Sequence, residues 1–248
     1  MKTLKLIKKV APEINEILER RYLILRGIQQ NQPIGRRTLA TELGFKERTV
    51  RDEVAILKNQ ELLDVDFTGT YITEKGHKLL DDLHEIYNHL KGIPQLEEEL
   101  RKLLKIKKVI IVPGNSSENR MVLKDMGKIT FKELKNNISS KDIIGITGGN
   151  TMASVVEEAV YDKKERDILV IPARGGLGRN LNTQSNSIAA KLAEGLGGSY
   201  RLLYIPDALE EEALEYILKN EEISHSLNLI NNMNTLVFGI GRADIMAK

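Results

Sequence analysis

Three short segments in the second half of the chain carry glycines, hydroxyls, amides and a guanidinium in a pattern that suits an anionic polyol. Residues 147–151 read Thr-Gly-Gly-Asn-Thr, residues 173–178 read Ala-Arg-Gly-Gly-Leu-Gly, and residues 182–187 read Asn-Thr-Gln-Ser-Asn-Ser. Glycines allow close backbone approach, N–H groups at a helix start bind phosphate, and a guanidinium pairs with it. One such turn is common as plain structure, but the three together favour a phosphorylated sugar as ligand.

Other ligands and catalysis fit these segments less well. The glycines of residues 173–178 are not spaced as GxGxxG, and no Lys follows Gly149 as a Walker motif requires. None of the three segments contains a His, Asp or Glu that could act as general acid or base. Asp207 and Asp244 are the best acid–base candidates, although helix-capping or loop roles suit them better. We therefore expect no catalytic residue, and keep a sugar-phosphate isomerase as the alternative.

The elements that must position these segments alternate between strands and helices. Short apolar, β-branched runs occupy residues 109–114, 142–147, 168–172, 200–206 and 235–241, and helical patterns between them occupy residues 124–137, 152–160, 187–196 and 208–219. Continuous apolar strands that alternate with helices predict a doubly wound α/β fold with a parallel sheet covered on both faces. The ligand of such a sheet lies beyond the carboxyl ends of its strands, where the three segments fall.

The first part of the chain predicts a different kind of domain. Apolar residues spaced by three and four predict a helix over residues 13–29, and residues 34–63 then read as two short helices joined at Gly44. This pair is typical of a helix-turn-helix, whose second helix enters the major groove of DNA. Residues 62–73 alternate and turn at Thr68-Gly69, which predicts the β-hairpin of a winged helix, although its tip carries no Arg or Lys.

Basic and hydroxyl side chains lie off the apolar face of the second short helix. Arg bonds guanine or phosphate and Thr reaches a base methyl or a phosphate, so these residue types suit a recognition surface. Residues 36–58 hold six Lys or Arg against four Asp or Glu, so a solvated helix face is the competing interpretation. The candidates for contact with double-stranded operator DNA are Arg36, Arg37, Lys46, Arg48, Thr49, Arg51 and Lys58.

The remaining sequence bounds the class of protein. An amphipathic helix over residues 73–90 precedes Gly92-Ile93-Pro94, so we expect a DNA-binding domain over residues 1–92 and an effector domain over residues 93–248. That helix is our candidate for the contact in a homodimer or tetramer, since one recognition helix reads only a half-site. The 248 residues hold no Cys and no apolar run long enough to cross a membrane, which favours the cytoplasm and excludes thiolate metal sites.

The assembled motifs carry a family resemblance over the whole chain. The helix-turn-helix followed by ITGGNTMA, ARGGLG, QSNSIAAKLAE and YRLLYIPDAL resembles the SorC-type family of bacterial sugar-binding transcriptional regulators, in its glycolytic subfamily. The resemblance implies a repressor whose effector domain is similar to sugar-phosphate isomerases but lacks catalysis, with no cofactor and with fructose 1,6-bisphosphate as effector. It implies that the sugar phosphate is held by Thr147, Gly148, Gly149, Asn150, Thr151, Arg174, Gly175 and Gln184.

Two departures from the family pattern affect these expectations. The family often has a second hydroxyl residue where this chain has Asn150. Similar regulators also continue beyond the point that corresponds to Lys248, so we expect a truncated effector domain with a short sheet, an open pocket and weakened inducer binding. A third function stays open beside the repressor and the enzyme: a protein-interaction module in which the winged helix is only a docking surface.

Overall fold

The computed structural model describes residues 9–117, 119–159, 164–175, 180–205 and 210–241. It divides into two compact units, Met1–Val122 and Leu123–Lys248. Each unit has an apolar core of its own. The two units are described one at a time below, and a division after residue 92 stays a prediction.

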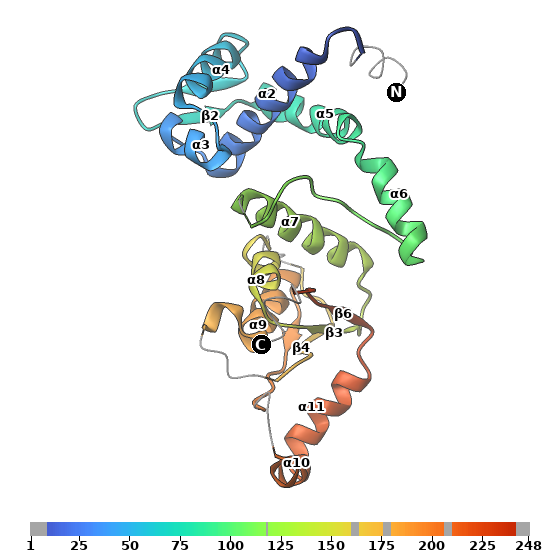
Figure 1. Ribbon diagram of the computed structural model, residues 1–248. Helices are drawn as coiled ribbons and strands as arrows, with labels where there is room; N and C mark the ends of the chain where they lie inside the picture. Colours follow the sequence, from blue (N-terminus) through green and yellow to red (C-terminus); the bar gives the residue numbers. More distant parts are fainter. Residues whose placement is uncertain (1–8, 118, 160–163, 176–179, 206–209, 242–248) are drawn as a thin grey trace. The chain divides into compact units, whose positions relative to one another are not determined.

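The first unit consists of helices and one two-stranded hairpin (Figure 1). Its elements are α2 (Pro12–Asn31), α3 (Arg36–Leu43), α4 (Glu47–Asn59), β1 (Leu63–Val65), β2 (Thr70–Ile72), α5 (Glu74–Leu90) and α6 (Ile93–Leu104). α2 is the central element and contacts α3, α4 and α5. Its side chains Tyr22, Leu25 and Ile28 are buried, as their three-and-four spacing predicts.

α3 and α4 form the expected helix-turn-helix. Gly44 ends α3 with φ 68°, a left-handed conformation that glycine adopts without strain, and its N–H bonds the last carbonyls of the helix. Leu39 of α3 and Val50 of α4 are fully buried in one core with α2. β1 and β2 then pair antiparallel with Leu63 opposite Ile72, so the predicted winged helix is confirmed.

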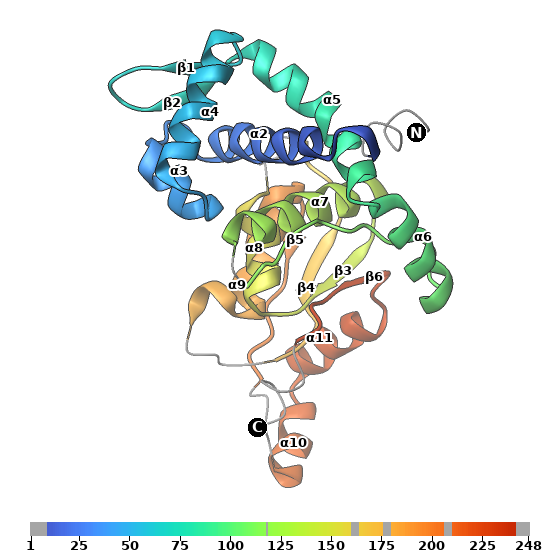
Figure 2. The ribbon, with the colours of Figure 1, turned by 45° about the horizontal axis from the view of Figure 1, so that its top comes forward.

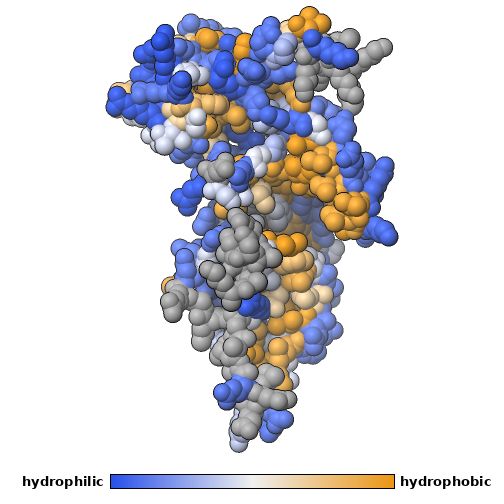
Figure 3. Space-filling view, in the orientation of Figure 1, coloured by the Kyte–Doolittle hydropathy of each residue, from blue (hydrophilic) through white to orange (hydrophobic). Residues whose placement is uncertain are grey.

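The apolar face of α5 packs against α2 within the same unit. Thr73 caps the helix by accepting a hydrogen bond from the backbone N–H of Gly76 at 3.0 Å. Near its other end, Tyr87 stacks on Tyr22 with ring centroids 4.2 Å apart. α6 has no such cover, since Leu103 is 75% exposed, and apolar side chains gather on the surface around this helix in Figure 3.

Within its described residues, the second unit is built on a parallel sheet of four strands. Its elements are α7 (Arg120–Asn137, whose first residues fall in the first unit), β3 (Ile143–Ile146), α8 (Asn150–Glu157), β4 (Leu169–Pro172), η1 (Leu181–Thr183), α9 (Ser185–Leu196), β5 (Ser199–Tyr200), α10 (Glu211–Leu218), α11 (Glu221–Asn231) and β6 (Thr235–Val237). Side chains of β3, β4 and α9 form the core, where Ile144, Val170 and Leu192 are fully buried.

The order of the strands places a reversal beside β3. The sheet order is β5-β4-β3-β6, so the chain runs outward from β3 to β5 and then returns to add β6 on the other side of β3 (Figure 2). Crossovers between parallel strands are right-handed, and the chain changes direction after β5. The segment that returns to β6 therefore covers the face of the sheet opposite to the face covered by the crossovers from β3 to β5. The fold is the doubly wound α/β fold predicted from sequence, and its switch point lies between β3 and β6.

The structure departs from the sequence-based expectation in three places. Residues 109–114 are not a strand: among the described residues they pair with no other strand, and the N–H of Ile111 donates to a carboxylate oxygen of Glu97 at 2.8 Å. α11 was not predicted from sequence. Among the described residues, the run at 200–206 contributes only Tyr200 to a strand, and the run at 235–241 contributes only its first three residues. Among the described residues, no helix is both long and apolar enough to span a bilayer.

Candidate nucleic-acid interface and ligand crevice

The predicted DNA contacts lie on α3, on α4 and at Lys46, the residue before α4. Six of the seven candidate side chains are exposed, and the seventh, Thr49, is partly buried. The exposed ones are Arg36, Arg37, Lys46, Arg48, Arg51 and Lys58. The buried residues Val50, Val54 and Leu57 face the core, so α4 presents its basic side to solvent.

Acidic neighbours already accompany three of these arginines. Asp52 lies 3.5 Å from Arg51 and 3.9 Å from Arg48, and Glu47 lies 3.3 Å from Arg37. All five side chains are more than half exposed, and ion pairs of this kind contribute little stability in water. The arginines can therefore exchange these partners for phosphates or bases at small cost.

Glu53 anchors α4 from its inner side. Its carboxylate accepts hydrogen bonds from Nε of Arg20 at 2.7 Å and from Nε of Arg21 at 2.8 Å, both on α2. Burial alone would raise the pKa of Glu53, but the hydrogen bonds and charges of Arg21 and Arg20 outweigh it and hold the pKa below its usual value. Sequence reasoning did not select Glu53, although it lies three residues after Val50 and one before Val54, on the apolar face.

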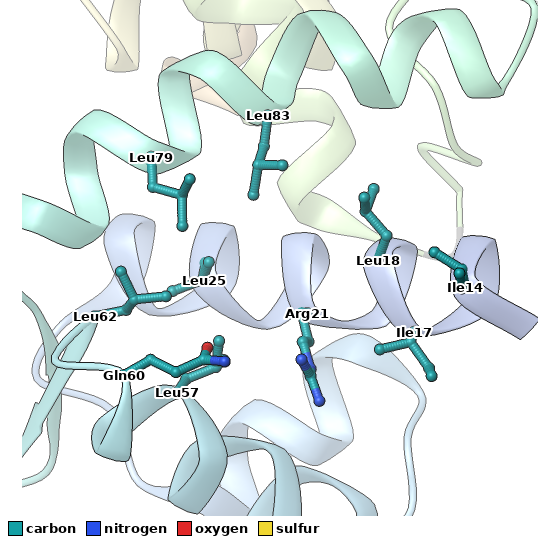
Figure 4. A pocket seen from close by; sticks show the side chains of 10 residues that line it. All are labelled: Ile14, Ile17, Leu18, Arg21, Leu25, Leu57, Gln60, Leu62, Leu79 and Leu83. Atoms are coloured by element: carbon teal, nitrogen blue, oxygen red, sulfur yellow. The ribbon is translucent and has the colours of Figure 1, made fainter. Parts of the chain in front are cut away.

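An apolar groove of about 300 Å³ runs beside this anchor, between α2, α4 and α5. Figure 4 shows Leu79 and Leu83 of α5 directed toward α2 from one side, and Leu57 of α4 and Gln60, the residue after α4, on the other. Leu25 and Leu57 are nearly fully buried, whereas Leu79 is 36% exposed. The helix that we predict as a dimer contact therefore retains part of its apolar surface after packing on α2.

In the second unit, the structure brings together the three segments singled out in the sequence. The N–H of Gly149, after β3, donates to the carbonyl of Thr183 at 2.9 Å. The hydroxyl of Ser185, at the start of α9, donates to the carbonyl of Arg174 at 2.8 Å. A side chain on Gly148 would meet the Thr183 carbonyl at 2.7 Å, so only glycine fits there. The carboxyl ends of β3 and β4 and the start of α9 therefore meet at one place, where a doubly wound sheet predicts a ligand crevice.

The hydrogen bond to Thr183 changes the role expected of Gly149. Its N–H is already used to join two loops, so it serves the shape of the crevice and not as a phosphate donor. The first N–H groups of α8, from Asn150 and Thr151, have no acceptor within their own helix. They lie at the positive end of the helix dipole, which favours an anion.

Arg174 and Gln184 belong to the two segments that meet the start of α8. Arg174 is exposed and follows β4, while Gln184 is half-buried and immediately precedes α9. Gly175 packs so closely against the carbonyl of Ile205 that a side chain would collide with it. Residues 176–178, Asp207 and Asp244 lie outside the described residues.

Gly239 was not selected from sequence as a site residue, whereas Asn186 lies in the predicted segment 182–187. A Cβ built on Gly239, which follows β6, would lie 4.0 Å from Cβ of Thr151, so the segment after β6 borders the start of α8. Asn186 is buried and pairs with the backbone of Leu203, with hydrogen bonds of 3.0 and 2.9 Å. The described residues hold no cluster of three or more potential metal ligands.

Comparison with known proteins matches both halves of the chain. Residues 17–87 match the family model "CggR N-terminal DNA binding domain", and residues 88–248 match the model "Putative sugar-binding domain". The chain is 39% identical over 241 residues to the central glycolytic genes regulator of Bacillus subtilis, covering 97% of this chain and 71% of that protein. It is likewise 39% identical to the regulator of the same name from Priestia megaterium.

The chain belongs to the SorC family of sugar-binding transcriptional regulators. A solved structure titled a "putative SorC family transcriptional regulator from Enterococcus faecalis" is 37% identical, with a TM-score of 0.56. The match covers 62% of this chain and 63% of that one, so the chain spans less than two thirds of that structure. The sorbitol operon regulator of Klebsiella pneumoniae, at 16% identity, has a TM-score of 0.53 over 88% of this chain and shares the fold.

These relatives decide between the open functional classes. This SorC-family regulator carries a DNA-binding domain and a sugar-binding domain, and its curated relatives regulate glycolytic genes. The isomerase alternative is excluded because the relatives are transcriptional regulators and not enzymes. The match with a DNA-binding domain also argues against the protein-interaction module, in which the winged helix would be only a docking surface. The individual site residues, the effector and the oligomeric state stay predictions.

Proposed function

We propose that this regulator is a repressor of glycolytic genes that binds operator DNA through α3 and α4 and responds to fructose 1,6-bisphosphate. The observation that carries the effector assignment is the meeting of residues 147–151, Arg174 and Gln184 at the carboxyl ends of β3 and β4. A helix start and a guanidinium suit phosphate, and an amide suits sugar hydroxyls.

The roles of the effector residues follow from their surroundings. One phosphate binds at the start of α8, where Asn150 and Thr151 offer N–H groups and Thr147 and Thr151 offer hydroxyls. Arg174 neutralises phosphate charge, and Gln184 orients the sugar. Gly148, Gly149 and Gly175 keep the loops close enough for these groups to reach one ligand.

Titration calorimetry tests the effector assignment. We expect fructose 1,6-bisphosphate to bind more tightly than fructose 6-phosphate, and unphosphorylated fructose not to bind. Arg174→Ala should weaken binding of the bisphosphate, because a guanidinium–phosphate pair is lost. Lys191→Ala, an exposed cation on α9, is the matched control and should bind as the wild type does. Equal binding of all three sugars would contradict the assignment.

The repressor acts as a homodimer in this proposal, because two recognition helices are needed to read two half-sites. α5 contributes the contact through the part of its apolar side that α2 leaves open, around Leu79 and Leu83. Sedimentation velocity should show a dimer or tetramer for the wild type and smaller species for Leu79→Lys. Lys78→Ala, on the neighbouring exposed position of α5, should leave the assembly unchanged.

A further inference from the structure

The tip of the wing presents a bare aromatic side chain. Phe67 lies in the loop between β1 and β2 and is 100% exposed. In Figures 1 and 2 this loop extends away from α2, α3 and α4. An isolated exposed apolar residue needs no explanation of its own. Phe67 differs from such a residue because the loop that carries it is fixed by hydrogen bonds.

Hydrogen bonds on both sides of Phe67 fix the loop. One carboxylate oxygen of Asp66 accepts hydrogen bonds from the N–H of Thr68 at 2.8 Å and from the N–H of Gly69 at 3.1 Å. The hydroxyl of Thr68 also bonds Asp66 and lies 2.6 Å from the hydroxyl of Tyr71. The turn is therefore built before any partner arrives, which lowers the entropy lost when Phe67 makes a contact.

The wing is also attached to the helix-turn-helix. Thr70 and Ile34, the residue two positions before α3, exchange backbone hydrogen bonds of 3.0 and 3.3 Å. A hollow of about 400 Å³ between them is lined by wing residues and by Arg36, Arg37 and Glu47. Phe67 lines the same hollow as the two arginines. Its position relative to the DNA-binding surface is thus set by the fold.

Charge decides what such a wing can contact. Residues 63–72 contain no Lys or Arg and include Asp64 and Asp66, so the hairpin has no cation to offer a phosphate. The carboxylate of Asp66 is occupied by its own loop, and the hydrogen bonds from Thr68 hold its pKa below the usual value. The cations next to the wing belong to α3. Proteins that bind the minor groove combine arginines of this kind with an apolar wedge.

We propose that the wing inserts Phe67 as an apolar wedge into the DNA minor groove beside the major groove occupied by α4, with Arg36 and Arg37 on the flanking phosphates. The contact rests on base stacking and shape, so it adds affinity without adding to the salt dependence of binding. It favours flexible pyrimidine–purine steps, which unstack at the lowest cost.

The test uses the whole chain and a duplex selected by the wild-type protein from a random library. Phe67→Ala should weaken binding about tenfold, within the range for loss of one aromatic stacking contact, while the slope of affinity against salt is unchanged. Phe67→Trp should retain wild-type affinity. Leu103→Ala, an exposed apolar residue on α6, is the control and should have no effect. Thermal midpoints should agree for all variants, since Phe67 has no intramolecular cover.

A spectroscopic arm identifies the groove. 2-Aminopurine placed at successive steps of the selected duplex should brighten at one step with the wild type and at none with Phe67→Ala. Netropsin, a minor-groove ligand, should compete with the wild type more strongly than with the variant. Unchanged affinity of Phe67→Ala, or a fall in affinity that is accompanied by a smaller assembly in sedimentation, would overturn the proposal. Arg48→Ala separates the two levels of inference: if it loses binding while Phe67→Ala does not, only the wing contact is wrong.

Discussion

Oε2 of Glu53 on α4 accepts a 2.8 Å hydrogen bond from Nε of Arg21 on α2, and this buried ion pair ties the recognition helix to the centre of its domain. A second arginine, Arg20, shares the same carboxylate. The side chain of Glu53 is 8% exposed, so its ionised form is stabilised by these two arginines more than by water. The orientation of α4, and with it of Arg48 and Arg51, therefore depends on Glu53.

Replacing Glu53 with Ala should cost the first unit about 3 kcal/mol, because two partly buried guanidinium groups lose their partner. Hydrogen exchange of the α4 amides measures this loss within the unit. Asp52→Ala removes an exposed carboxylate from the adjacent position and should change the same free energy by less than about 0.5 kcal/mol. Equal effects of the two substitutions would show that Glu53 does not anchor the helix.

The same ion pair predicts a dependence on pH. The pKa of Glu53 is lower in the folded protein than its ordinary value of 4.5, so the pair contributes its stability above pH 4.5. That stability is lost as the pH falls through the folded pKa. The difference in unfolding free energy between the wild type and Glu53→Gln should therefore be constant at neutral pH and shrink below pH 4.5. A difference that grows on acidification would contradict the assignment.

Arg48 and Arg51 should each contribute base or phosphate contacts from α4. Substituting either with Ala should weaken binding to a selected duplex by about 1–3 kcal/mol if it contacts a base. A phosphate contact would instead lower affinity for all sequences and reduce the slope against salt by about one. Filter binding at several salt concentrations separates these outcomes. Retained affinity in both variants would remove α4 from the interface.

Asp52 forms ion pairs with Arg51 at 3.5 Å and with Arg48 at 3.9 Å. Asp52→Asn should therefore raise affinity for random DNA and steepen its fall with salt, since two guanidinium groups are released toward phosphate. Binding of the same variant to poly-dIdC, followed by anisotropy, provides the measurement. Glu61→Gln, a distant exposed carboxylate paired with Lys75, is the control and should leave this affinity unchanged.

Gly148→Ala should open the ligand crevice. The added methyl group would lie 2.7 Å from the carbonyl of Thr183, so the loop after β3 must move away from η1. We expect reduced protection of the Gly149 N–H from hydrogen exchange and weaker binding of fructose 1,6-bisphosphate, with DNA binding intact. A variant that keeps both the protection and the bisphosphate affinity would show that the close approach is dispensable.

Tyr87 should titrate well above the ordinary range of a tyrosine. Burial and the nearby Glu19 raise its pKa from 10.0 to about 12, which favours the neutral phenol in the folded state. The resulting stability is present below pH 10 and is lost as the pH rises toward 12. Absorbance titration at the phenolate band should lose a step near pH 12 in Tyr87→Phe. An unchanged titration curve would contradict the burial of this hydroxyl.

Periodicity was sufficient to predict most of the helices and the class of the sheet. The three-and-four spacing around Val50 and the alternation around Tyr71 follow from which faces are buried, and burial is what those patterns encode. Residues 109–114 show the limit of that reasoning. Their composition suits a strand, but a strand also needs a free edge to pair with, and composition carries no information on edges.

The site was predictable as a set of segments and less so as a set of roles. Glycines after β3 and an arginine after β4 could be related because parallel strands end at one edge of a sheet. Whether the Gly149 N–H faces a ligand or Thr183 depends on contacts between segments more than thirty residues apart. Glu53 is a similar case, since its role as the anchor of α4 depends on two arginines that lie more than thirty residues earlier in the chain.

The position of β6 bears on how the chain is made. The N–H of Ile143 at the start of β3 donates to the side chain of Asn234, a residue 91 positions later. At the pace of ribosomal synthesis, β3 waits roughly 5–20 s for this partner, whereas the helix-turn-helix is already translated. During that interval one edge of β3 is open to other chains. A nascent polypeptide of this kind gains its DNA-reading surface before it can sense a sugar.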